Sequence, residues 1–200
     1  MLFNQLLNIS IQSELVSIRA YKKSDFNDLN DSFDVAFFQY FLNDYNGFKE
    51  FETEQLNLIK DRRLLFLSLI DNSTNKVFGV TSIYDIDDNN RSIEVGKTWL
   101  AKDYQGTGYN LVFKYYLFKT LLEDFKLNRV QLKADAENLR SVTAMKSIGL
   151  NYEGKLLSHK VVKGSRVRDT EMFSMTQNTW QDIKKFMLTN LNKKFTDIGW

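Results

Sequence analysis

The stretch Gln105-Gly106-Thr107-Gly108-Tyr109-Asn110 constrains the fold most, because the spacing of apolar residues changes across it. Upstream, Ile93, Val95, Lys97 and Trp99 alternate with other residues, which predicts a strand. Downstream, Leu111, Tyr115, Phe118, Leu122 and Phe125 recur three or four positions apart and predict a helix from about 109 to 125. The stretch is therefore expected to be a strand-to-helix turn.

The two glycines of this turn favour an anionic ligand. Without a Cβ, Gly106 and Gly108 let the backbone approach a ligand closely and adopt positive φ. The first turn of the following helix adds unpaired N–H groups and the positive end of the helix dipole. We expect a diphosphate to fit there, although a plain turn is the more common explanation for two glycines alone.

Length and composition predict one domain. A chain of 200 residues can bury about 70% of its unfolded surface, and 43% hydrophobic with 26% charged residues is ordinary for a globular protein. We expect a single domain over residues 1–200, with a core from about 16 to 178 and a final helix from about 179 to 192.

The chain has no cysteine and only His159, which excludes thiol nucleophiles, disulfides and Cys- or His-rich metal sites. A magnesium site made only of carboxylates is possible but nothing supports it, so we predict no metal. Residues 1–100 carry 10 basic and 15 acidic side chains, and residues 101–200 carry 17 and 10. The basic half suits a polyanionic cofactor, but two unequal solvated surfaces explain it equally well. We predict no nucleic-acid partner.

No signal peptide or membrane span is expected, and a cytoplasmic location follows. Periodicity and turn residues predict an α+β fold with a mixed, mostly antiparallel sheet of about seven strands flanked by helices. The expected strands lie near 16–21, 64–70, 77–86, 91–100, 129–134, 151–162 and 166–176. Helices are expected after an N-cap at Ser24-Asp25 and near 48–61, 109–125, 139–148 and 179–192. Gly149 is expected to end the helix at 139–148 in a left-handed conformation. The final helix is expected to pack Trp180, Ile183, Phe186 and Met187 against the body and to leave a frayed end. The aromatic segment 35–48 is either core or the lining of an acceptor slot.

Several motifs together resemble the GCN5-related N-acetyltransferase family, which binds acetyl-CoA. They are Gln105-Gly106-x-Gly108 after a strand ending in Trp99-Leu100, Asn138-x-x-Ser141 and Gly149-Leu150. The resemblance covers roughly residues 16 to 180 and is strongest from 91 to 155. Asn110 departs from the last position of the family signature, and asparagine there resembles the subgroup that acetylates the N-terminal alanine of ribosomal proteins.

The resemblance implies the family's acyltransferase fold, with acetyl-CoA as cosubstrate and an amine as acceptor. The backbone around Trp99, Leu100 and Ala101 would hold the pantetheine arm. Amides of Gly106, Thr107, Gly108, Tyr109 and Asn110 would bind the diphosphate, with Gln105 leading into the turn. Asn138 would hydrogen-bond the arm, although a helix N-cap is a sufficient reason for an asparagine there.

Direct acetyl transfer needs a base for the amine and a proton for the departing thiolate. Glu94 is the first candidate for the base, acting through a water, and an exposed strand carboxylate is the equal alternative. Asp135 is the second candidate, or a turn residue. Many relatives carry an acidic tyrosine where this chain has Met145, so the Ser141 hydroxyl is the candidate acid, or simply a residue supporting the cap.

The remaining polar candidates are expected to be structural. His159 lies alone in a strand, and Arg168-Asp169 is interpreted as an ion pair near the sheet edge. Lys102, Arg140 and Lys146 are possible partners of the cofactor's 3′-phosphate, with surface solvation the simpler explanation.

Three functions remain after these considerations. The first is an acetyl-CoA-dependent N-acetyltransferase that moves acetyl to a primary amine by direct attack, most like the ribosomal-protein-alanine type that modifies a peptide N-terminus. The acidic first half also suits a polyamine or aminoglycoside acceptor. The alternative from another class is a non-catalytic acyl-CoA binding module. Fold alone does not choose the acceptor, and nothing in the sequence indicates the oligomeric state.

Overall fold

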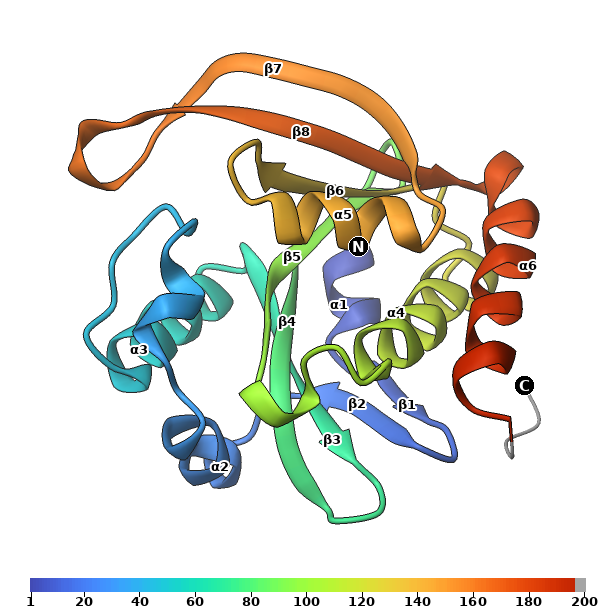
Figure 1. Ribbon diagram of the computed structural model, residues 1–200, viewed down its shortest axis with the longest axis horizontal. Coiled ribbons are helices and arrows are strands. Elements are labelled where there is room, and N and C mark those ends of the chain that lie inside the picture. Colours follow the sequence, from blue (N-terminus) through green and yellow to red (C-terminus); the bar gives the residue numbers. More distant parts are fainter. Residues whose placement is uncertain (197–200) are drawn as a thin grey trace.

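The computed structural model describes residues 1–196, which form one open eight-stranded sheet in the order β1-β2-β3-β4-β5-β6-β8-β7 (Figure 1). The strands are β1 Ser10–Gln12, β2 Val16–Ala20, β3 Leu64–Asp71, β4 Lys76–Asp87, β5 Ser92–Leu100, β6 Arg129–Asp135, β7 Asn151–Val161 and β8 Val167–Thr176. Neighbouring strands are antiparallel except β5 and β6, which are parallel. The predicted α+β class and mixed, mostly antiparallel sheet are confirmed.

Helices cover both faces of the sheet and enclose two hydrophobic cores (Figure 1). On one face lie α1 Leu2–Leu6, α4 Tyr109–Lys119, α5 Leu139–Ser147 and α6 Gln177–Lys194. On the other lie α2 Phe26–Asp31 and α3 Phe48–Lys60, with the short helix Val35–Phe38. The aromatic segment 35–48 contributes Phe38, Tyr45 and Phe48 to this second core, as one of its two interpretations predicted.

The parallel pair of β5 and β6 is short, and this positions the site. It extends only from Ser92 opposite Arg129 to Glu94 opposite Gln131. Beyond Glu94 the two strands are no longer paired, so the edge of β5 that faces β6 has no strand partner within residues 1–196. A gap therefore opens in the middle of the sheet, above α4.

A bulge in β5 corrects one sequence prediction. Strict alternation places Val95, Lys97 and Trp99 on one face, but Gly96 pairs with Ser82 while Trp99 pairs with Val80, so two residues of β5 lie opposite one of β4. Lys97 has a φ of 52° there. Because one inserted residue reverses the alternation, Val95 packs in the first core and Trp99 in the second.

The N-terminal prediction was incomplete. No element was predicted over residues 1–13, yet they contain α1 and β1, which are too short to show a periodic pattern. Asp25 is the N-cap residue of α2, as expected, but its side chain makes no capping bond to that helix. The buried carboxylate accepts hydrogen bonds from Arg19, Ser68 and the Lys22 N–H instead.

Two helix ends also differ from expectation. The helix predicted over 109–125 is α-helical only to Lys119 and continues as a π-helical turn over Thr120–Asp124. The final helix is longer than predicted, and Phe186 is 46% exposed rather than packed, although its ring lies against Gly149. Gly149 has the predicted left-handed φ, 82°, after α5. The expected frayed C-terminus lies partly outside the described residues.

Candidate active site

The turn after β5 presents unpaired amides at the N-terminus of α4. Gly106 has a φ of 80° and Gly108 a φ of 104°, and α4 begins immediately after Gly108. The N–H groups of Gly106, Thr107 and Gly108 donate no hydrogen bond within residues 1–196. The Gln105 side chain donates to the carbonyl of Leu100 at 2.8 Å and so fastens the turn to β5. We call residues 105–110 the cradle.

The two glycines of the cradle have different surroundings. A Cβ on Gly106 would meet nothing within 4 Å, so that side is open to a ligand. A Cβ on Gly108 would lie 2.9 Å from ring carbons of Phe195, which follows α6. Lys194 reaches the same turn and donates to the Gly106 carbonyl at 3.3 Å. Only Gly106 therefore leaves open space for a diphosphate, while Gly108 makes room for Phe195.

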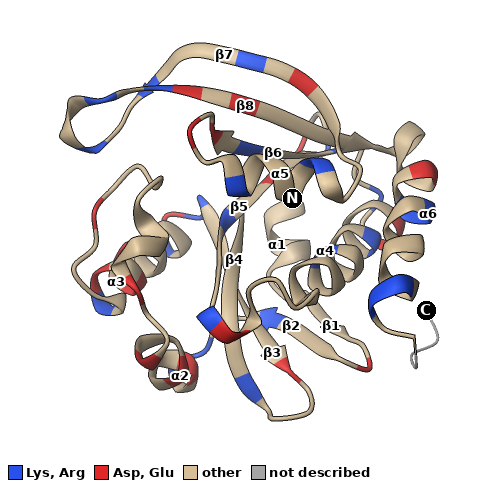
Figure 2. Ribbon diagram, in the orientation of Figure 1, with Lys and Arg blue, Asp and Glu red and all other residues tan. Residues whose placement is uncertain are grey.

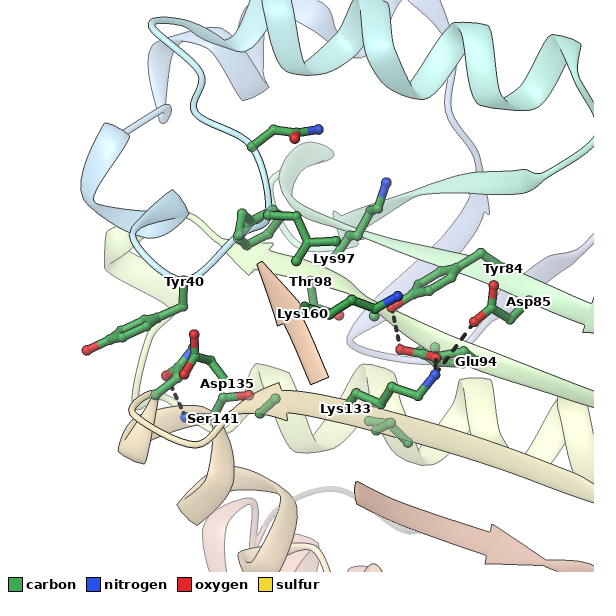
Figure 3. A pocket seen from close by; sticks show the side chains of 18 of the residues that line it. Tyr40, Tyr84, Asp85, Glu94, Lys97, Thr98, Lys133, Asp135, Ser141 and Lys160 are labelled. Carbon is green, nitrogen blue, oxygen red and sulfur yellow. Dashed lines mark hydrogen bonds and ion pairs between the residues drawn. The ribbon is translucent and has the colours of Figure 1, made fainter. Parts of the chain in front are cut away.

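A cavity of about 530 Å³ opens where β5 and β6 separate. Its walls come from β5, β6, α5, the β7–β8 hairpin and the loop around Tyr40 and Tyr45, and Lys114 of α4 also lines it. Figure 3 shows Glu94, Lys133, Tyr84, Ser141 and other polar side chains that line it. The cradle residues do not line this cavity. A ligand extending from the cradle along the free edge of β5 would enter it.

Glu94 is a buried carboxylate in this cavity, only 2% exposed. One oxygen accepts from the Tyr84 hydroxyl at 2.6 Å, and the other pairs with Lys133 Nζ at 2.5 Å (Figure 3). Burial raises the pKa of Glu94, and the bonds from Lys133 and Tyr84 only partly oppose this. A carboxylate accepts about four hydrogen bonds, so Glu94 retains acceptor capacity for a water.

Comparison with known proteins identifies the family. A family model described as "Acetyltransferase (GNAT) domain" matches residues 16–151. The chain belongs to this family. The resemblance noted in the sequence is thereby confirmed.

Relatives and structural neighbours agree with this assignment. The chain is 30% identical over 106 residues to "Putative ribosomal N-acetyltransferase YdaF" of Bacillus subtilis (strain 168), an alignment covering 53% of this chain and 57% of that protein. A GCN5-related N-acetyltransferase from Brucella melitensis superposes with a TM-score of 0.82 at 22% identity, over 91% of this chain and 85% of that one. Spermidine N-acetyltransferase from Vibrio cholerae, solved with CoA and spermine, gives 0.70 at 19% identity, over 84% and 99%.

The structure brings only some of the predicted residues of this GNAT domain together. Glu94, Asn138 and Ser141 line the cavity, with Asp135 and Met145 beside them. Trp99 and Leu100 are buried in opposite cores and do not line it. Ala101 donates its N–H to Phe78 at 2.8 Å, so that amide is already used.

Asn138 and Asp135 both have structural partners. The Asn138 side chain accepts from the Ser141 N–H at 3.0 Å, which is the N-cap that the sequence suggested. Asp135 is buried, pairs with Arg166 and accepts from the Glu137 N–H at 3.0 Å. These contacts support the interpretation of Asp135 as a turn residue, whereas the Ser141 hydroxyl makes no bond within the described residues.

Several cavity residues were missed or assigned elsewhere, and Tyr84, Lys133 and Lys160 were not singled out at all. Lys114 lies three positions after Leu111 and four before Phe118, and this place on the apolar face of α4 was a signal that could have found it. The expected Arg168–Asp169 ion pair is wrong, because Asp169 accepts from the Ser158 N–H while Arg168 lines the cavity. His159 lines the cavity too, and its buried Nδ1 has no hydrogen-bond partner among residues 1–196.

None of the helices within residues 1–196 is long and apolar enough to cross a membrane.

Proposed function

We propose that this protein is an acetyl-CoA-dependent N-acetyltransferase that transfers acetyl directly to a primary amine. The observation that carries the proposal is the gap between β5 and β6, which leaves a free strand edge between the cradle and the buried carboxylate of Glu94. Membership of the GNAT family supports the same activity. The sheet runs from Ser10 to Thr176, beyond the family match on both sides, which supports one acetyltransferase domain.

The residues present fit coenzyme A. The unpaired amides of Gly106, Thr107 and Gly108, at the positive end of α4, suit its diphosphate. The free edge of β5 beyond Glu94 offers backbone groups to the amides of its pantetheine arm, and the Asn138 side-chain amide adds a donor. When bound, acetyl-CoA supplies the activated acetyl thioester.

Glu94 is the proposed general base. A raised pKa brings a carboxyl group closer to the operating pH of an enzyme, where general-base catalysis is most efficient. Lys133 and Tyr84 fix its orientation from two sides. Glu94 would accept the amine proton through a water that occupies its remaining acceptor position.

Ser141 is the proposed proton donor for the leaving thiolate. Its hydroxyl lines the same cavity, in the first turn of α5. Met145, one turn further along α5, carries no proton to give. The Asn138 side chain caps α5 by accepting from the Ser141 N–H, and this fixes the turn that carries Ser141.

The acceptor proposed from the relatives is a peptide N-terminal amine. The 30% identity to a protein named as a ribosomal N-acetyltransferase supports it. A polyamine is the second candidate, supported by the fold shared with spermidine N-acetyltransferase. Likeness at 19% identity carries the fold only, so the peptide is preferred.

The test is acetyl transfer from labelled acetyl-CoA to a panel of peptides, amino acids and polyamines, with free thiol release measured in parallel. We expect equal amounts of thiol and acetylated amine. Calorimetric binding of acetyl-CoA without turnover of any amine would overturn the proposal and leave an acyl-CoA binding module. Absence of binding by folded protein would remove both.

A further inference from the structure

The cavity carries more positive than negative side chains. Within the described residues it is lined by four carboxylates and six basic side chains, besides His159. The carboxylates are Glu54, Asp85, Glu94 and Asp135. The basic side chains are Arg63, Lys97, Lys114, Lys133, Lys160 and Arg168.

Each carboxylate already has a cation within reach. Glu94 pairs with Lys133 at 2.5 Å and Asp85 lies 3.6 Å from the same ammonium. Glu54 pairs with Lys97 at 3.4 Å and accepts from the Tyr45 hydroxyl at 2.8 Å. Asp135 pairs with Arg166, which does not line the cavity. Every carboxylate of the cavity therefore has a basic partner, although Lys133 is shared by Glu94 and the exposed Asp85.

Several basic groups, by contrast, lack a close counter-ion within residues 1–196. Arg168 is only 12% exposed through its side chain, its Nε has no hydrogen-bond partner, and Asp135 is 4.0 Å away. Lys160 and the buried Lys114 form no ion pair. Burying a charge without a partner is unfavourable, so Arg168 and Lys114 favour an anionic ligand in the cavity, and the exposed Lys160 can add a second contact to it.

The register of the hairpin brings two of these cations together. Lys160 of β7 lies directly opposite Arg168 of β8, and both line the cavity. Like charges directly opposite in a sheet destabilise it unless an anion lies between them. Figure 2 shows that basic positions gather toward the tip of this hairpin, and Figure 3 shows Lys160 among the cavity's side chains. The lowered pKa of His159, caused by burial and then by Lys160, Lys133 and Arg168, agrees with a positive local potential.

The anionic parts of coenzyme A do not account for these cations. Its diphosphate is assigned to the cradle, whose residues do not line the cavity, and its pantetheine arm is uncharged. Its 3′-phosphate is attached to the ribose, on the opposite side of the diphosphate from the thioester, and its candidate partners Lys102, Arg140 and Lys146 do not line the cavity either. A second anion must therefore come from the acceptor. We propose that the acceptor is a primary amine that also carries a carboxylate, which the guanidinium of Arg168 and the ammonium of Lys160 bind.

This inference rests on the proposed acetyltransferase function and defines its acceptor. An arginine fork matches a carboxylate with two parallel hydrogen bonds, which suits Arg168 for the recognition. A polyamine would bring more positive charge to cations that already lack partners. The acceptor is then either a free amino acid or a peptide N-terminus followed by an acidic residue.

The experiment compares amines that differ only in the carboxylate. Lysine is tested against cadaverine and lysinamide, tyrosine against tyramine and tyrosinamide, and peptides beginning Ala-Asp against Ala-Asn. We expect kcat/KM to be at least tenfold higher for the carboxylate-bearing member of the responding set. The responding set distinguishes a free amino acid from a peptide.

Arg168→Gln should abolish this tenfold preference while leaving the KM for acetyl-CoA unchanged, and Arg168→Lys should retain part of it. Lys155→Gln is the matched control, because Lys155 lies on the same hairpin but pairs with Glu171 outside the cavity. The inference is overturned when cadaverine or spermidine is acetylated as well as lysine. It is also overturned when Arg168→Gln slows every amine equally.

A binding measurement distinguishes failure of this inference from failure of the proposed acetyltransferase function. Lysine and cadaverine are titrated calorimetrically into protein saturated with CoA, which needs no turnover. Tighter binding of lysine that Arg168→Gln removes supports the inference even when no amine is acetylated. Equal binding, or binding of neither, both in this pair and in the same titration of the Ala-Asp and Ala-Asn peptides, overturns it whatever the catalytic assay gives.

Discussion

The ring of Phe195 occupies the space beside Gly108 that a side chain there would need. A Cβ on Gly108 would lie 2.9 Å from two carbons of that ring, and 3.1 Å from a side-chain carbon of Lys194. The end of α6 therefore packs directly on the cradle at the N-terminus of α4 (Figure 1). Glycine at position 108 therefore allows both this packing and the positive φ of the backbone turn.

Gly108→Ala should destabilise the protein more than Gly106→Ala does. Both positions have positive φ, which costs about 1–2 kcal/mol for a residue with a Cβ. Only Gly108 adds overpacking against Phe195, worth about 1–3 kcal/mol. Urea unfolding of the two variants measures the difference. In a background that carries both Phe195→Ala and Lys194→Ala the two substitutions should cost the same, and an excess at Gly108 that persists there would contradict the steric explanation.

Glu94→Gln should lower kcat/KM at least tenfold, about 1.4 kcal/mol of barrier. The amide keeps the shape of the carboxylate but cannot take a proton. In the unmodified protein the rate should rise with pH until Glu94 is deprotonated, with a midpoint above the ordinary carboxyl range because burial raises its pKa. A pH profile of kcat/KM for both forms checks this. Glu171→Gln, outside the cavity, is the control, and an unchanged acid limb in Glu94→Gln would exclude Glu94 as the base.

Asn138→Ala and Ser141→Ala should distinguish the helix-capping role of Asn138 from the proposed proton-donor role of Ser141. Losing the Asn138 side chain removes the hydrogen bond to the Ser141 N–H and should reduce the free energy of unfolding by about 1 kcal/mol. Ser141→Ala keeps that N–H, so stability should change little while kcat falls at least tenfold. Denaturant unfolding and steady-state rates test both. Full activity of Ser141→Ala would mean that the thiolate proton comes from another donor.

The local sequence pattern was sufficient to predict the secondary-structure elements around the cradle. The change of period at Gly106 and Gly108 placed the end of β5 and the start of α4 correctly, because both signals lie within a few residues. The same holds for the cap at Asn138 and the left-handed turn at Gly149. The sequence resemblance added the family's acyltransferase fold, but the order of the strands within the sheet was not predicted.

Relationships between distant residues could not be predicted in this way. The pairing of β5 with β6 stops after Glu94, and the bulge at Lys97 turns Trp99 to the opposite core, because register depends on packing across the whole sheet. Phe195 reaches Gly108 only through the docking of α6. Arg168 and Lys160 come together through a hairpin register that shifts at an irregularity around Ser158 in β7, which leaves no clear local pattern.

Lys114→Met should stabilise the protein at neutral pH. Lys114 is buried in the cavity without an ion pair within residues 1–196, and burial lowers its pKa from 10.5 to about 8. A folded-state pKa below the unfolded one means that the charged amine opposes folding, and the difference corresponds to roughly 3 kcal/mol at pH values below 8. Methionine has a similar length and no charge to bury.

The pH dependence gives this prediction a definite sign. Between about pH 8 and pH 10.5 the unfolded chain keeps the Lys114 proton while the folded protein has released it. The free energy of unfolding of the unmodified protein therefore rises with pH and approaches that of Lys114→Met. Urea unfolding of both proteins across this pH range measures how their difference in free energy of unfolding decreases. Lys119→Met, which also removes one positive charge from α4, is the control. A Met variant less stable than the unmodified protein at pH 7 would show that the Lys114 ammonium has a stabilising partner in solution, and an anion held in the cavity would then be the first to test.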